Sequence, residues 1–254
     1  MPGAERELLI GDSVKAAAYP NVVQMLDKGE HTGQFAIVMP RADISLQKYI
    51  EQHSGPFTAE DALPILRDIA TALAAIDGAI VHRDIKPANV LRLNGSWQLA
   101  DFGISKYAGA STQADTRKFD KTPLYAAPEQ WRDQTATSKT DVYALGGIAY
   151  LLISGNSPFP GPGIADFRNQ HLNEHPAALS GGTSQLRSLI QQCLLKPAAA
   201  RPTPANILDR LNKATEREAD SPGVRRLAQV TENRVNKQAE EYQQASVQQE
   251  EEEE

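Results

Sequence analysis

The stretch HRDIKPAN at residues 82–89 decides how this sequence is interpreted. It places a lysine two residues, and an asparagine five residues, after the carboxylate of Asp84. The triplet DFG follows at residues 101–103, and the triplet APE follows at residues 127–129. A lone DFG is weak evidence for any function. The three motifs in this order form a far more specific combination.

Apolar patterns around these motifs predict an α+β fold. A strand is expected where apolar and β-branched residues form a short run, and a helix where apolar residues recur every three or four positions. Thr58 followed by Asp61 also resembles the capping box that opens a helix. The loop DKGEHTG at residues 27–33 would join an expected strand over 22–26 to another over 35–39. The expected elements are strands over 22–26, 35–39, 89–93 and 97–100, and helices over 60–77, 139–154 and 184–196.

The composition of the 254 residues is that of an ordinary globular protein. Hydrophobic residues make up 41% and charged residues 23%, which argues against a wholly disordered or fibrous chain. The net charge is −6, but Glu250–Glu254 supplies −5 of it, so the rest of the chain is nearly neutral. A nearly neutral body argues against a sequence-independent nucleic-acid binder. Cys193 is the single cysteine, which favours a reducing compartment, and we expect a cytoplasmic location.

No membrane segment is expected in this chain. The N-terminus has no basic region followed by a long apolar run, so it does not resemble a signal peptide. The longest apolar stretch, residues 142–153, is shorter than the ~20 residues that a spanning helix requires. This stretch is better explained as a buried core helix.

The three motifs resemble those of the protein kinase family. Within it, their residues are most similar in kind to those of the eukaryotic-like (Hanks-type) serine/threonine kinases of bacteria. The resemblance covers roughly residues 5–212. It implies a protein-kinase-like fold in which residues 1–42 form a partial small lobe with an αC-like helix, two strands and a hinge. Residues 43–212 would form the helical large lobe. Residues 213–254 would be a polar, acidic tail, either helical or disordered.

The resemblance also implies ATP and Mg²⁺ as cofactors and a protein with a Ser/Thr acceptor as substrate. Asp84 would accept the proton of the substrate hydroxyl, and Lys86 would meet the transferring phosphoryl group. Asn89 and Asp101 would ligate Mg²⁺, a hard cation that prefers oxygen ligands. Thr122 would hydrogen-bond near Asp84 and Lys86.

The adenine site implied by the resemblance lies in the segment FAIVMPRADISL at residues 35–46. Met39 falls at the gatekeeper position of the family. The carbonyl of Pro40 and the N–H of Ala42 would bind adenine, and Leu91 would form the floor of the pocket.

Further residues are expected to hold the site in place. By resemblance, Glu129 pairs with Arg201, Asp141 accepts backbone N–H groups of the catalytic loop, and His82 packs and hydrogen-bonds within that loop. Cys193 is expected in the core. Four other histidines lack metal-ligand spacing and are expected at the surface: His31, His53, His171 and His175.

Two features normal in the family are missing from this sequence: a G-x-G-x-x-G loop and a lysine in a V-A-I-K strand. The expectation is either a chain that starts late, with a truncated small lobe, or a degenerate kinase. Three functions stay open. They are a Ser/Thr protein kinase, a non-catalytic kinase-like (pseudokinase) binding module that regulates a partner, and a small-molecule phosphotransferase with an H-x-D-x-x-x-x-N pattern. Lys86-Pro87, the APE triplet and the polar loop at residues 104–122 favour a polypeptide substrate over a small one.

Overall fold

The structure, a computed structural model, describes residues 17–31, 34–101 and 123–219. The chain divides into two compact units, residues 1–212 and residues 213–254. The described part of the second unit is short, because it consists of the last seven residues of one helix. The first unit contains all the other described residues.

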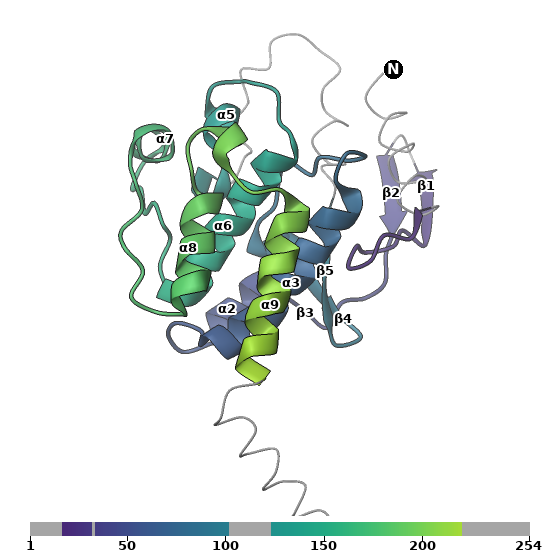
Figure 1. Cartoon of the computed structure of the whole chain (residues 1–254). Coiled ribbons are helices and arrows are strands. Elements are labelled where there is room, and N and C mark those ends of the chain that lie inside the picture. The colour runs from purple at the N-terminus through teal and green to yellow at the C-terminus, as the bar shows by residue number, and fades with distance from the viewer. Residues whose placement is uncertain (1–16, 32–33, 102–122, 220–254) are drawn as a thin grey trace, which may run out of the picture. The chain divides into compact units, whose positions relative to one another are not determined.

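The described strands form two small antiparallel sheets (Figure 1). One is a two-stranded hairpin of β1 and β2, in which Asp27 lies opposite Val38. The other has the strand order β3-β4-β5, and Val90 lies opposite Leu99 in its β4–β5 pair. The bounds are β1 Asp27–His31, β2 Gln34–Val38, β3 Ile44–Ser45, β4 Val90–Leu93 and β5 Ser96–Leu99.

Helices form most of the remaining described chain, with α3 and α6 packed against each other (Figure 1). The α-helices are α2 Leu46–Gln52, α3 Ala59–Ile76, α5 Pro128–Trp131, α6 Ser138–Ser154, α7 Ile164–Asn173, α8 Ser184–Cys193 and α9 Pro204–Ala219. Three short 3-10 helices are η1 Pro87–Asn89, η2 Pro123–Tyr125 and η3 Ala198–Ala200. The prediction of an α+β fold is confirmed.

Helix α3 begins where the sequence predicts. The Thr58 hydroxyl accepts a hydrogen bond from the N–H of Asp61 at 3.2 Å and donates to its carboxylate at 2.7 Å. Such a cap satisfies a backbone N–H that has no partner within the helix. The predicted apolar stripe faces the core, since each of its four members is at most 2% exposed: Leu66, Ile69, Leu73 and Ile76.

Most residues of helix α6 are buried, which the apolar run at residues 142–153 explains. Gly146 lies where α6 meets α8, and a Cβ atom added there would come within 2.7 Å of the Cβ of Cys193. The glycine therefore allows the two helices to approach closely. Cys193 is 2% exposed, so its predicted place in the core is confirmed. The predicted helices over 139–154 and 184–196 correspond to α6 and α8.

The first predicted strand is wrong in its position. Residues 22–26 were expected to pair with residues 35–39, but β1 lies at residues 27–31, within the expected loop. Val22 forms a parallel bridge to Leu99 of β5 instead, and the N–H of Val23 donates to the Leu99 carbonyl at 2.9 Å. The start of the apolar run, Val22 and Val23, is therefore buried beside β5, whereas Leu26 at its end is exposed. The second strand agrees with β2.

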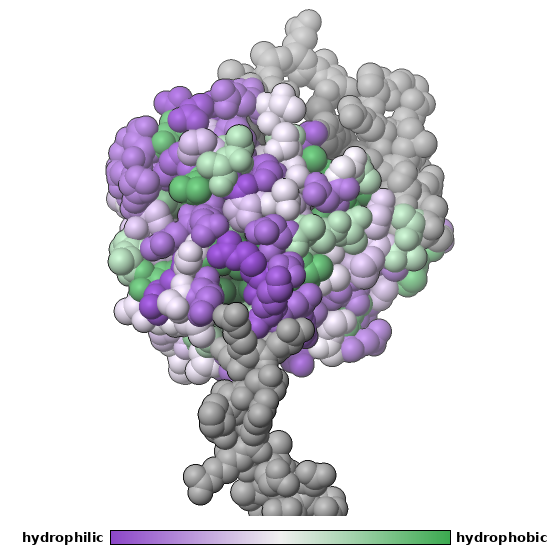
Figure 2. Space-filling model, viewed as in Figure 1, coloured by the Kyte–Doolittle hydropathy of each residue, from purple (hydrophilic) through white to green (hydrophobic). Residues whose placement is uncertain are grey.

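The predicted strands over 89–93 and 97–100 agree with β4 and β5 within one residue. Among the described residues, no helix combines the length and the apolar character that crossing a membrane requires. Figure 2 shows one face, on which hydrophilic residues surround smaller hydrophobic areas.

Candidate active site

A residue of α6, Asp141, anchors the loop that carries HRDIKPAN. Both oxygens of the buried Asp141 carboxylate accept backbone hydrogen bonds, one from the N–H of His82 at 2.9 Å and one from the N–H of Arg83 at 2.8 Å. This is the role expected for Asp141. Burial raises the pKa of Asp141 to about 7, although the two N–H donors act in the opposite direction.

His82 fixes the other side of the loop. It is 1% exposed, and its Nε2 donates to the Ala100 carbonyl at 2.9 Å, which confirms its packing and hydrogen-bonding role. Burial lowers the pKa of His82, so the ring is neutral. With the proton on Nε2, Nδ1 accepts the N–H of Asp84 at 3.4 Å.

Three of the predicted site residues form one polar cluster. Lys86 Nζ lies 3.0 Å from Asp84 Oδ2, and Asn89 Nδ2 donates to the Asp84 backbone carbonyl at 2.9 Å. A longer contact of 3.4 Å joins Asn89 Nδ2 to Asp84 Oδ2. The side chain of Asp84 is 11% exposed and that of Lys86 23%, so the carboxylate remains accessible at the surface. η1 brings Asn89 back beside Lys86, whose carbonyl accepts the N–H of Asn89 at 2.9 Å.

Asp101 lies beside this cluster, because the chain leaves β5 at Leu99 and passes Asn89. The N–H of Ala100 donates to the Asn89 carbonyl at 2.8 Å, so the residue after Ala100 emerges next to Asn89. Asp101 has a φ of 60°, a left-handed conformation that is uncommon outside glycine and that asparagine and aspartate adopt most readily. The predicted site residue Thr122 lies outside the described residues.

Asn89 and Asp101 are the residues that could hold a metal ion. The amide nitrogen of Asn89 is turned to the Asp84 carbonyl, which directs its oxygen, the metal-binding atom, elsewhere. In the part of the chain that the structure describes, no three His, Cys, Asp or Glu residues gather as a metal site. Two oxygen ligands suit Mg²⁺, which keeps several waters and phosphate oxygens as its other ligands.

Three of the predicted adenine residues, Met39, Pro40 and Ala42, lie in the segment between β2 and β3, and the fourth, Leu91, lies in β4. Ala42 and Leu91 are partly buried and pack together against Val23 and its neighbours in a small apolar cluster. Pro40 is also partly buried, whereas Met39 is 45% exposed. Ala42 and Leu91 therefore pack against the same apolar cluster, while their role in adenine binding stays a prediction.

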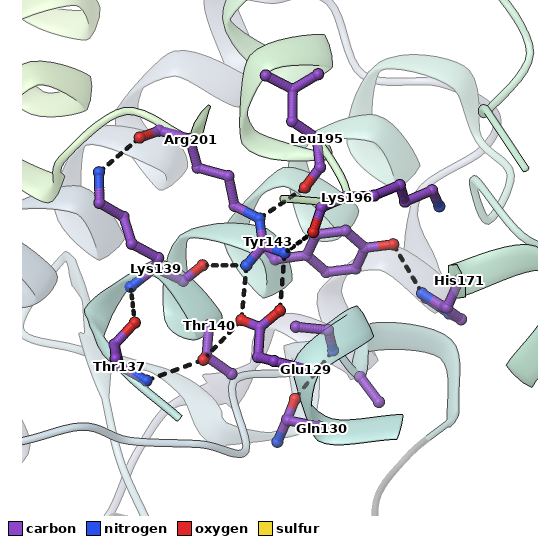
Figure 3. A network of polar contacts seen from close by, with 12 residues as sticks. Glu129, Gln130, Thr137, Lys139, Thr140, Tyr143, His171, Leu195, Lys196 and Arg201 are labelled. Carbon is purple, nitrogen blue, oxygen red and sulfur yellow. Dashed lines mark hydrogen bonds and ion pairs between the residues drawn. The ribbon is translucent and has the colours of Figure 1, made fainter. Parts of the chain in front are cut away.

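A buried ion pair holds the segment that contains the APE triplet. Glu129 and Arg201 face one another through two bonds of 2.7 and 2.8 Å, and Thr140 donates to the same carboxylate at 2.8 Å (Figure 3). Burial acts to raise the pKa of Glu129, but the hydrogen bonds and charge of Arg201 hold it below its usual value. Arg201 also donates to three backbone carbonyls: those of Leu195, Lys196 and Lys139. The pair expected from the sequence is present.

The surface position predicted for His171 is wrong. His171 is 1% exposed, and its Nδ1 lies 2.9 Å from the hydroxyl of Tyr143 (Figure 3). Its ring also packs against Phe159 at 4.7 Å and Trp131 at 6.1 Å between centroids. Burial lowers its pKa to about 3, so it is a neutral core residue. His175 is exposed, as predicted.

Comparison with known protein families matches residues 3–211 to the family described as "Protein kinase domain". The chain belongs to the protein kinase family. The predicted family and the kinase-like α+β fold are thereby confirmed. Members of this family generally use ATP and Mg²⁺ to phosphorylate proteins.

Individual relatives are bacterial kinases. The chain is 36% identical over 205 residues to "Serine/threonine-protein kinase PkaA" of Streptomyces coelicolor, covering 78% of this chain and 37% of that protein. It is 34% identical over 212 residues to "Serine/threonine-protein kinase PrkC" of Bacillus subtilis, covering 82% of this chain and 32% of that protein. The chain thus spans about a third of the length of these curated relatives.

Proposed function

We propose that this chain transfers the γ-phosphoryl group of ATP to serine or threonine hydroxyls of a protein substrate. The observation that carries the proposal is the cluster of Asp84, Lys86 and Asn89, held in place by the buried carboxylate of Asp141. It joins a surface carboxylate, a cation and a metal-binding amide. These groups match what phosphoryl transfer needs, which is positioning and neutralisation of charge.

In this proposal, the hydroxyl oxygen of the substrate attacks the γ-phosphorus, and Asp84 accepts the proton of that hydroxyl. The bond between that phosphorus and the bridging oxygen of ADP breaks, and ADP leaves with the electron pair. Lys86, 3.0 Å from the Asp84 carboxylate, supplies positive charge beside the transferring group. Mg²⁺ held by Asn89 and Asp101 would neutralise the phosphate oxygens. Thr122 would help to position the acceptor.

The nucleotide would lie against Leu91 and Ala42, with adenine bound to the Pro40 carbonyl and the Ala42 N–H and with Met39 at its edge.

The charge and the cysteine content of the chain support two further parts of the proposal, the kind of partner and the location. The nearly neutral charge of residues 1–249 supports a protein partner and no nucleic acid. The single cysteine, buried and free, supports a cytoplasmic location.

One observation favours a second candidate function, a non-catalytic kinase-like binding module. Three large apolar side chains of the segment around β1 and β2 are exposed: Leu26 at 53%, Val38 at 49% and Met39 at 45%. Exposed apolar side chains that lie close together are typical of a surface that binds another protein.

The test is label transfer from γ-labelled ATP with Mg²⁺ to a generic basic protein substrate. The variant is Asp84→Asn, which keeps the shape of the side chain but removes its charge. The matched control is Asp133→Asn at an exposed aspartate, since asparagine tolerates the positive φ found there. We expect transfer by the wild type and Asp133→Asn, and a loss of about 100-fold or more in Asp84→Asn, because general bases contribute that much. A folded wild type that transfers no label would contradict the proposal and favour the binding module.

A further inference from the structure

Gln130 connects the APE segment to the loop that carries Asp84. Its carboxamide oxygen accepts the N–H of Ala127 at 2.9 Å, and its amide nitrogen donates to the carbonyl of Arg83 at 2.9 Å. One end of the amide therefore meets a donor and the other an acceptor, which fixes its orientation. The side chain points away from the Glu129–Arg201 pair (Figure 3).

The bond to Ala127 is a helix cap. Ala127 is the N-cap of α5 and Gln130 is its third helical residue, the position from which Glu or Gln reaches back to the N-cap N–H. A glutamate would make this bond equally well and would suit the positive end of the helix better. The cap therefore does not explain a glutamine at this position.

The bond to Arg83 requires a donor, and glutamine has one where glutamate does not. Arg83 has a φ of 70°, a conformation that a residue with a side chain holds only when its surroundings impose it. Its N–H is held by Asp141 at 2.8 Å, and its carbonyl is held by Gln130.

This carbonyl belongs to the peptide bond that leads into Asp84. The N–H of the same peptide bond points to Nδ1 of His82. Because a peptide group is planar, Gln130 and His82 together set its plane, and this plane determines the direction in which the Asp84 side chain leaves the backbone. Arg83, Asp84 and Gln130 also line one small pocket together with Tyr125 of η2.

We propose that Gln130 is a positioning residue that fixes the Arg83–Asp84 peptide to the N-cap of α5, so that the base and the segment preceding α5 are aligned as one unit. The catalytic part of this inference rests on the proposed function, whereas the positional part does not. Gln130 acts only through Asp84 and does not touch the reacting atoms.

The decisive variant is Gln130→Glu, which keeps the cap and replaces the donor with an oxygen that repels the Arg83 carbonyl. The matched control is Gln134→Glu, the same change of charge at an exposed residue four positions later. Gln130→Met removes both hydrogen bonds, so it also measures the contribution of the helix cap to stability. The readouts are kcat and the KM for ATP, the melting temperature, and hydrogen exchange of the backbone amides of residues 82–85.

We expect Gln130→Glu to lower kcat about tenfold, the equivalent of one lost hydrogen bond to a catalytic loop, with the KM for ATP within about twofold. Its melting temperature should fall less than that of Gln130→Met, because the glutamate keeps the cap that methionine removes. Exchange at residues 82–85 should be about threefold faster in Gln130→Glu and unchanged in Gln134→Glu.

Gln130→Glu and Gln134→Glu that behave alike in kcat and in exchange would overturn the inference. If the wild type transfers no phosphate, the proposed function fails, and exchange alone decides the positional claim. Faster exchange only in Gln130→Glu then supports it, and equal exchange in the two variants refutes it.

Discussion

The catalytic loop at residues 82–89 and the β1–β2 hairpin at residues 27–38 are stabilised in different ways. The loop has little regular structure, yet α6, β5 and α5 each hold it through a polar contact: Asp141, the Ala100 carbonyl and Gln130. The hairpin has regular pairing along its five residue pairs, yet Val38 at its end is half exposed. The difference indicates that an irregular loop can be held by long-range polar partners, whereas the hairpin depends on its own backbone pairing. The predictions below test this difference, from the largest effect to the smallest.

Removing Arg201 should have the largest effect on stability. Arg201→Ala leaves the buried Glu129 carboxylate without its partner and three carbonyls without their donor. Breaking a buried ion pair in this way costs about 3–5 kcal/mol. Urea unfolding followed by circular dichroism measures this loss.

The control for this prediction is Arg132→Ala, at an exposed arginine at the end of α5, the helix that contains Glu129. It should change the free energy of unfolding by less than about 0.5 kcal/mol. Equal midpoints for the two variants would show that the Glu129–Arg201 pair does not stabilise the segment that contains the APE triplet.

Asp141 should give the protein a pH-dependent stability. Its folded-state pKa of about 7 is raised above the ordinary value of 3.8, so the folded protein keeps a proton that the unfolded chain releases between these values. Stability contributed by this group is therefore present below about pH 4 and is lost as the pH rises to about 7, by up to about 4 kcal/mol.

The measurement is the unfolding midpoint in urea at several pH values for the wild type and Asp141→Asn. The variant should lose this part of the slope between pH 4 and 7. A slope that is identical in the two proteins would contradict the prediction.

The same substitution in two further regions, the segment buried against β5 and the exposed end of the hairpin, sharpens the comparison. Val22→Thr places a hydroxyl at a site that is 2% exposed, and it should cost about 1–3 kcal/mol. Val38→Thr makes the same change where the side chain is 49% exposed, and it should stay within about 0.5 kcal/mol. Thermal unfolding of both variants gives the difference, and equal losses would refute the contrast between the two regions.

Local patterns predicted the elements that depend on local chemistry. Helix α3 follows from the Thr58 cap and the apolar stripe, and the β4–β5 pair follows from two apolar runs around a short polar turn. The residues of the candidate site came from the resemblance carried by the HRD, DFG and APE motifs. The structure brings Asp84, Lys86 and Asn89 together, while their roles stay predictions.

The errors concern partners that lie far apart in the sequence. The apolar run at 22–26 correctly signals burial for Val22, Val23 and Met25 but not for Leu26, and periodicity does not say that its partner is β5, more than 70 residues away. His171 is buried because a tyrosine hydroxyl and aromatic rings from other elements surround it, and no local pattern shows this. Gln130 has a local signal as a helix cap, but its bond to Arg83 spans 47 residues.

The most direct test of the central claim identifies the product. A protein substrate is incubated with Mg²⁺ and ATP and either the wild-type chain or Asp84→Asn, and its phosphorylated residues are determined by mass spectrometry. We predict phosphoserine or phosphothreonine with the wild type and at most a trace with the variant. Equal phosphorylation by both proteins would contradict the role of Asp84, and no phosphorylation by a folded wild type would contradict the proposed activity itself.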